Sequence, residues 1–127
     1  MEERAPSSET RSLSETPVQK MSLTALSRGQ LELAKTATSG RSAHTVHGGH
    51  EHTLRQTVIA LIAGHSLDEH ENPAEATVYV LTGRVVLRAG SDSWEGSPGD
   101  LLTVPRARHS LHAVEDSTVL LTVATRP

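Results

Sequence analysis

From residue 41 onward, apolar and polar positions alternate with a period close to two, which is typical of β-strands. Glycine-rich and proline-rich turn sequences separate the alternating segments. We expect strands over residues 43–47, 50–64, 75–81, 84–88, 101–104, 109–114 and 118–125, with turns at Gly48-Gly49, Gly83, 90–93 and 97–100. Many short strands with turn chemistry between them predict an all-β sandwich or barrel.

The pattern before residue 41 is different. Ser22 is a candidate N-cap, and the leucines that follow it recur at helical spacing, which predicts one amphipathic helix over Leu23 to Thr38. Ser39-Gly40 is expected to end this helix. Residues 1–21 are dominated by Ser, Thr, Glu and Pro, so too few apolar groups are present to offset the entropy of ordering them. We therefore predict a disordered leader (1–21), a helix segment (22–40) and a β-barrel (41–127).

Composition narrows the class of protein. A chain of 127 residues has room for one domain, and the absence of Phe means that aliphatic residues must fill its core. The net charge of −3 gives no basic surface that would attract nucleic acid, so we do not expect nucleic acid as a partner. The longest apolar run, Val58 to Ala63, is too short to span a membrane. With no Cys and no secretory signal, a cytoplasmic protein is expected.

Two glycine-bounded segments resemble the motif pair of a known family. The first runs from Gly64 through His70 to Gly83, and the second contains Gly99, Pro105 and His109, the last residue of PRARH. At these spacings the chain resembles the cupin family. The resemblance implies a double-stranded β-helix (jelly-roll) barrel, a homodimer, and a pocket for a small molecule at His70 and His109.

The resemblance also implies a mononuclear site for iron, manganese, nickel or zinc, but the expected ligands are only partly present. His70 and His109 remain, whereas the second family histidine falls on Asn72, the glutamate on Ala76 and the asparagine on Ala113. Glu75 is one residue from the glutamate position, and such a shift turns a strand side chain to the other face. Two histidines and an amide fall short of the three or four ligands that such a metal needs.

A histidine-rich segment offers a second candidate site. A two-residue loop at Gly48-Gly49 would pair His47 with His50 and place His47, His50 and His52 on one face, as a possible separate zinc or nickel site. The alternative is a solvated hairpin with no specific role. If the face that carries His52 and Gln56 is the barrel interior, these two residues would line the pocket of His70 and His109.

Two functions follow from these observations. The first is a non-enzymatic or regulatory cupin that binds a small molecule in its barrel, with a pocket lined by His70, Asn72 and His109, joined by His52 and Gln56. The alternative is a metal-dependent enzyme of dioxygenase or isomerase type, with His70, His109 and replacement ligands. The fold alone does not choose between them.

Overall fold

The structure is a computed structural model that describes residues 17–49, 51–70 and 75–125. Within these residues one helix precedes nine strands. The elements are α2 (Leu23–Thr36), β1 (Arg41–His47), β2 (Leu54–Leu61), β3 (Ser66–His70), β4 (Glu75–Thr82), β5 (Val85–Ala89), β6 (Asp92–Gly96), β7 (Leu101–Thr103), β8 (His109–Ala113) and β9 (Ser117–Ala124). The described part of the chain contains no helix that is both long enough and apolar enough to cross a bilayer.

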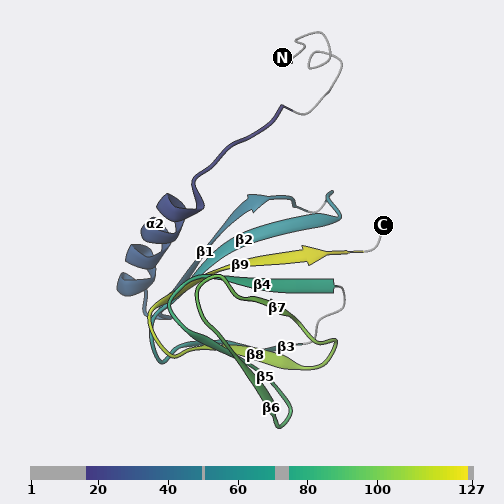
Figure 1. Ribbon diagram of the computed structural model, residues 1–127. Coiled ribbons are helices and arrows are strands. Elements are labelled where there is room, and N and C mark those ends of the chain that lie inside the picture. The colour runs from purple at the N-terminus through teal and green to yellow at the C-terminus, as the bar shows by residue number, and fades with distance from the viewer. Residues whose placement is uncertain (1–16, 50, 71–74, 126–127) are drawn as a thin grey trace.

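The strands form two antiparallel sheets that face each other (Figure 1). One sheet has five strands in the order β1-β2-β9-β4-β7, and the other has four in the order β3-β8-β5-β6. Most strands that are neighbours in a sheet are not consecutive in sequence, such as β2 and β9 or β3 and β8. The chain therefore crosses repeatedly between the two sheets, which is the jelly-roll arrangement. The predicted all-β jelly-roll barrel with one N-terminal helix is therefore confirmed. In Figure 1 the layers diverge to the right, and we call this the wide end; β4 and β8 begin there.

An aliphatic core fills the space between the sheets, as the absence of Phe predicts. Strands β2, β4, β5, β8 and β9 each contribute residues of one face, because successive side chains point to opposite sides of a sheet. On β2, Ile59 and Leu61 belong to this core, while Val58 and Ala60 are fully buried on the opposite face. The cluster consists of Ile59, Leu61, Val78, Val80, Val85, Leu87, Val104, Leu111, Ala113 and Val119.

Helix α2 covers the outer face of the five-stranded sheet, mainly over β1 and β2. The N-cap prediction is confirmed, because the Ser22 side chain accepts a hydrogen bond of 3.1 Å from the backbone N–H of Ala25. The helix ends at Thr36, two residues before the predicted Thr38, where Ala37 takes an extended conformation. Of the predicted leader, residues 1–16 lie outside the described residues, and residues 17–22 have no regular secondary structure.

Two strands, β3 and β6, were not predicted. Both are polar in sequence, and both lie at the edges of the four-stranded sheet, next to β8 and β5 respectively. Four of the five β6 residues are exposed, so this strand has little apolar alternation to detect. It forms because its backbone pairs with β5 from Val85 to Ala89, a contact that sequence periodicity does not report.

The predicted two-residue turn at Gly48-Gly49 is wrong. His47 pairs with Gln56, so the connection from β1 to β2 covers residues 48–53. Strand β2 begins only at Leu54, where it starts to pair with Ala124 of β9. A register shift between Thr45 and His47 accompanies the change. Pairing with β9 over the whole of β2 therefore overrides the local turn signal of the glycine pair.

Gly83, which closes the first motif, joins β4 to β5 in a conformation that requires glycine. Its φ is +84°, and a Cβ at this position would lie 2.3 Å from the carbonyl oxygen of Asp116. The close approach of the Asp116–Ser117 backbone connects this turn to the start of β9. The motif glycine is therefore explained by a contact between segments distant in sequence.

Candidate functional site

His109 is a buried histidine on the inner face of the four-stranded sheet. It is the first residue of β8, at the wide end, and alternates with the buried residues Leu111 and Ala113. The side chain is 6% exposed, and Nδ1 lies 2.9 Å from the carbonyl oxygen of Ala107. A carbonyl only accepts, so Nδ1 must carry the hydrogen in this bond, and in the neutral ring Nε2 is then the acceptor. The Ala107 carbonyl thus sets the tautomer and orientation of the ring.

His70 lies beside His109 in the backbone. It is the last residue of β3, and its Cα pairs with that of His109 across the β3–β8 ladder. The structure thereby brings together, at one level of one sheet, the two histidines that the sequence places in the family motifs. The side chain of His70, and Asn72 as a whole, lie outside what the structure describes.

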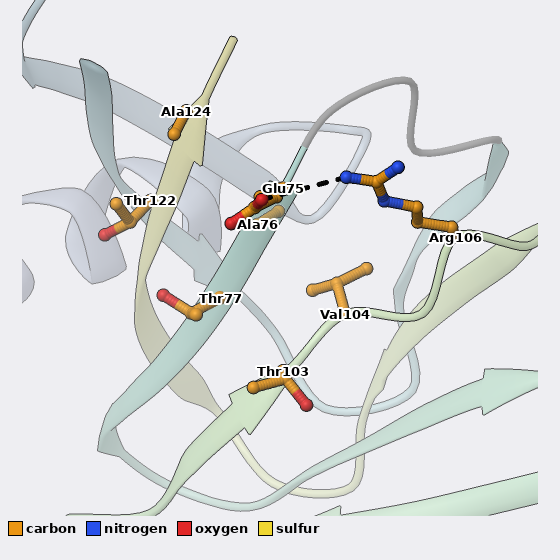
Figure 2. A pocket seen from close by; sticks show the side chains of 8 residues that line it. All are labelled: Glu75, Ala76, Thr77, Thr103, Val104, Arg106, Thr122 and Ala124. Atoms are coloured by element: carbon orange, nitrogen blue, oxygen red, sulfur yellow. Dashed lines mark ion pairs between the residues drawn. The ribbon is translucent and has the colours of Figure 1, made fainter. Parts of the chain in front are cut away.

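The positions of the other family ligands carry methyl groups. Ala113 is fully buried, and Ala76 packs against the core. Glu75 is turned outward, as the one-residue shift predicts: its side chain is 79% exposed, and Oε2 lies 3.8 Å from Nη2 of Arg106 (Figure 2). Glu75 therefore does not replace the missing carboxylate on the inner face.

The described side chains supply only part of a metal site at the family position. Their His, Cys, Asp and Glu side chains contain no group of three or more that could hold a metal ion. Of the family's ligand positions whose side chains are described, only His109 offers a donor atom, since Ala76 and Ala113 offer none. One imidazole nitrogen is fewer than the three protein ligands of an open catalytic site.

His47, at the end of β1, and His52, in the β1–β2 connection, lie elsewhere. The rings of His47 and His52 meet edge to face with centroids 5.4 Å apart, and both line a pocket of about 600 Å³ with Gln56 and Leu54. Gln56 lies on the outer face of β2 with Val58 and Ala60, opposite the face that carries Ile59 into the core. Its Nε2 donates a hydrogen bond of 3.1 Å to Thr122 Oγ1. The structure therefore joins Gln56 to His47 and His52 but not to His109.

Of the three histidines in the predicted separate metal site, the structure describes two in contact, His47 and His52. His50 lies outside the described residues, and His52 belongs to the connection rather than to a strand. His47 pairs with Gln56 in the strand ladder, so its ring contact with His52 is not the predicted arrangement in which His47 pairs with His50. His112 faces away from His109, as predicted, with its Nδ1 2.7 Å from Ser66 Oγ.

Sequence reasoning missed a row of polar residues across the outer face of the five-stranded sheet. Five residues lie at one level of register, one from each strand: His47, Gln56, Thr122, Thr77 and Thr103. The last three line a pocket of about 270 Å³ at the wide end, beside Glu75 and Arg106 (Figure 2). Each threonine alone is an ordinary strand residue, and only the strand order makes them neighbours.

Comparison with solved structures shows the same fold in other proteins. A conserved protein of unknown function from Streptococcus pyogenes is 24% identical, with a TM-score of 0.64 over 72% of this chain and 79% of that one. An RmlC-like cupin from Desulfovibrio desulfuricans is 25% identical, with a TM-score of 0.59 over 66% and 81%. KdgF from Halomonas sp. is 20% identical, with a TM-score of 0.62 over 72% and 85%.

Among curated proteins, no significant sequence match was found. The family comparison is decisive for the class of protein. The cupin domain model matches residues 57–125, which include both motif segments and strands β2 to β9 almost entirely. This match covers more than half of the chain, and the jelly-roll topology agrees with it. The chain belongs to the cupin family.

Proposed function

We propose that this cupin binds a small molecule at the wide end of its barrel, in a non-enzymatic or regulatory role. The observation that carries the proposal is the buried His109 ring, whose Nδ1 is held by the Ala107 carbonyl at 2.9 Å. His109 also has another interaction within the protein, and we propose that a ligand competes with it by donating a hydrogen bond to Nε2 of the oriented ring. His70 and Asn72 are proposed as further pocket residues, because His70 pairs with His109 in the β3–β8 ladder.

The side chains near His109 indicate the chemical class of such a ligand. The core beside His109 is aliphatic, and Ala76 and Ala113 contribute methyl groups where other family members carry polar ligands. Apolar walls with one polar contact favour a molecule with an apolar body and a hydroxyl donor. We propose this class of ligand for the barrel. Gln56 and His52 are left out of the proposed pocket because Gln56 lies on the outer face.

A matched pair of probes tests this proposal. Cyclohexanol has the apolar body and the donor, whereas cyclohexanone has the same ring but only accepts. In titrations of the ¹⁵N-labelled full chain, cyclohexanol should shift the amide signals around His109 at concentrations where cyclohexanone has little effect. His109→Ala should abolish the difference. His112→Ala is the control, because His112 lies on the other face of β8. If cyclohexanol binds His109→Ala as well as the unchanged chain, the barrel proposal is wrong.

A metal-dependent enzyme is the second candidate. One observation favours it: metal-binding histidines usually donate their second ring N–H to a carboxylate or backbone carbonyl, as Nδ1 of His109 does to Ala107. Elemental analysis of protein purified without an affinity tag tests it directly. Stoichiometric iron, manganese, nickel or zinc that is lost in both His109→Ala and His70→Ala would support the enzyme. Protein that takes up none of these metals would rule it out.

We also propose that the chain is a cytoplasmic homodimer that does not bind nucleic acid. Exposed apolar residues support the dimer: Leu101 is 60% exposed and pairs with Tyr79, which is 37% exposed, on the outer face of the five-stranded sheet. Burying such a pair between copies removes apolar surface from water. Light scattering after size-exclusion chromatography should give the mass of two chains, and Leu101→Lys should shift it toward one. A single-chain mass at every concentration would contradict the dimer.

A further inference from the structure

A partly open pocket lies between helix α2 and the five-stranded sheet, on the side of the sheet that faces away from the barrel core. It has a volume of about 250 Å³. Its lining residues are Thr24, Ser27, Arg28, Leu31, Leu81 and Thr82. The four helix residues follow the pattern i, i+3, i+4, i+7, so they share one face of α2. The four helix residues lie outside both motif segments, and Leu81 and Thr82 come directly before the motif glycine Gly83.

A strand irregularity helps to shape this pocket. Leu81 and Thr82 are consecutive, and in a regular strand they would point to opposite faces of the sheet. Both nevertheless line the pocket, because the register between β4 and β9 shifts between Val80 and Thr82. Such irregularities redirect side chains. The Thr82 hydroxyl is held 2.7 Å from that of Thr118, which leaves Leu81 as the apolar contribution of β4.

Ser27 supplies a polar group that the described part of the chain does not satisfy. The residue is 4% exposed, and its Oγ has no hydrogen-bond partner among the described residues. A buried hydroxyl left in this state has lost its hydrogen bonds to water without gaining one in the protein, which is unfavourable. A polar atom entering the pocket from outside the chain would recover this cost. The buried, unpartnered hydroxyl is therefore the first sign of a ligand.

Arg28 supplies a positive charge next to Ser27 in the same pocket wall. The ion pairs of the described residues join Lys35 to Glu32, Arg84 to Glu95 and Arg106 to Glu75, and Arg28 forms no ion pair with a described residue. The partly buried side chains of Leu31 and Leu81 add apolar surface to the pocket. The pocket thus combines one cation, hydroxyl groups and an aliphatic surface.

We propose that this pocket binds a small aliphatic carboxylate. The guanidinium of Arg28 would bind the carboxylate, with the hydroxyls of Ser27 and Thr24 as additional donors, and the aliphatic chain would lie on Leu31 and Leu81. One cation matches one negative charge, and apolar walls suit a hydrocarbon chain rather than a phosphate, which is more strongly hydrated. A volume of about 250 Å³ limits the ligand to a short chain. This site is independent of the barrel site at His109.

Titration of the ¹⁵N-labelled full chain tests the proposal with three probes: hexanoate, hexanamide and inorganic phosphate. We expect saturable shifts with hexanoate at the amides of residues 24–31 and 81–82, and at least roughly tenfold weaker binding of hexanamide, which lacks the charge. Arg28→Gln should weaken hexanoate to the level of hexanamide. Arg55→Gln is the matched control, because Arg55 is exposed on β2 and does not line this pocket.

Three results would overturn the proposal. Hexanamide could bind as well as hexanoate, phosphate could bind in place of hexanoate, or Arg28→Gln could leave hexanoate binding unchanged. Measuring hexanoate in His109→Ala separates this site from the barrel. Binding that is retained in His109→Ala and lost in Arg28→Gln supports the helix–sheet pocket, whereas the reverse pattern would move the carboxylate to the barrel and overturn the proposal.

Discussion

The two faces of the five-stranded sheet differ in what they bury. The inner face contributes Ile59, Val80 and Val119 to the core, each less than a tenth exposed. The outer face is fully buried where α2 covers it, as at Val58 and Ala60. Beyond the helix, Tyr79 and Leu101 are exposed, and the threonine row (Thr77, Thr103 and Thr122) is at least partly exposed. Packing against the second sheet constrains the inner residues by size and shape, whereas most outer residues meet no second layer.

The two faces also differ in their candidate binding groups. The inner face is aliphatic, and the family's polar positions on it have become Ala76 and Ala113, so His109 stands out as a buried polar group at the wide end. On the outer side, helix α2 carries Ser27 and Arg28 at its pocket with the sheet, and His47 and His52 lie together near the β1–β2 connection. We therefore expect inner substitutions to change the free energy of unfolding most, and outer substitutions to change binding.

The largest effect is expected for Leu61→Ala. Leu61 is 1% exposed in the core, so its truncation should lower the free energy of unfolding by about 2–5 kcal/mol. Leu101→Ala, on the outer face at 60% exposed, should cost less than about 0.5 kcal/mol in the monomer. Urea unfolding followed by the fluorescence of Trp94 measures both. Equal losses at the two positions would remove the distinction between the faces.

Ala76→Glu should restore a family carboxylate on the inner face. With His109 already oriented by Ala107, we expect zinc or manganese to bind roughly tenfold or more tightly than to the unchanged chain. Thr77→Glu places the same charge on the opposite face of β4 and is the matched control. Isothermal titration calorimetry compares the two variants. The argument about faces fails if Thr77→Glu gains as much metal affinity as Ala76→Glu.

Ser27→Ala should stabilise the ligand-free chain by about 1 kcal/mol, because it removes a buried hydroxyl that has no described partner and replaces it with the best helix former. The same variant should weaken hexanoate binding. Thermal unfolding with and without hexanoate measures both effects. A clear loss of stability would show that the hydroxyl is already satisfied in the free protein, contrary to the helix–sheet proposal.

The smallest effect is expected for the Glu75–Arg106 pair on the outer rim. Both side chains are more than half exposed and their charged atoms are 3.8 Å apart, so solvent screens the interaction. Glu75→Ala should change the free energy of unfolding by less than about 0.5 kcal/mol. Urea unfolding at low and high salt should agree within error. A loss above 1 kcal/mol would instead give this surface pair a structural role.

Parts of the fold and site could be predicted because the signal is local. Ser22 followed by leucines at helical spacing identified the helix start, and the alternation from Glu75 to Leu81 identified β4. The motif spacing placed His70 and His109 together, and their backbones do pair. Strand β6 and the true β1–β2 connection were missed, because each depends on pairing with a distant strand.

The sequence by itself determined the class of fold, because turn residues and a period of two specify many short strands whose apolar faces must be buried together. It also determined the reduced set of donors at the family positions, since Ala76 and Ala113 have no donor atoms whatever their placement. Only the tertiary structure decided which face each remaining group occupies. Strand order and register shifts put Gln56 on the outside, assembled the threonine row, and brought Ser27 and Arg28 against Leu81, because these depend on contacts between distant segments.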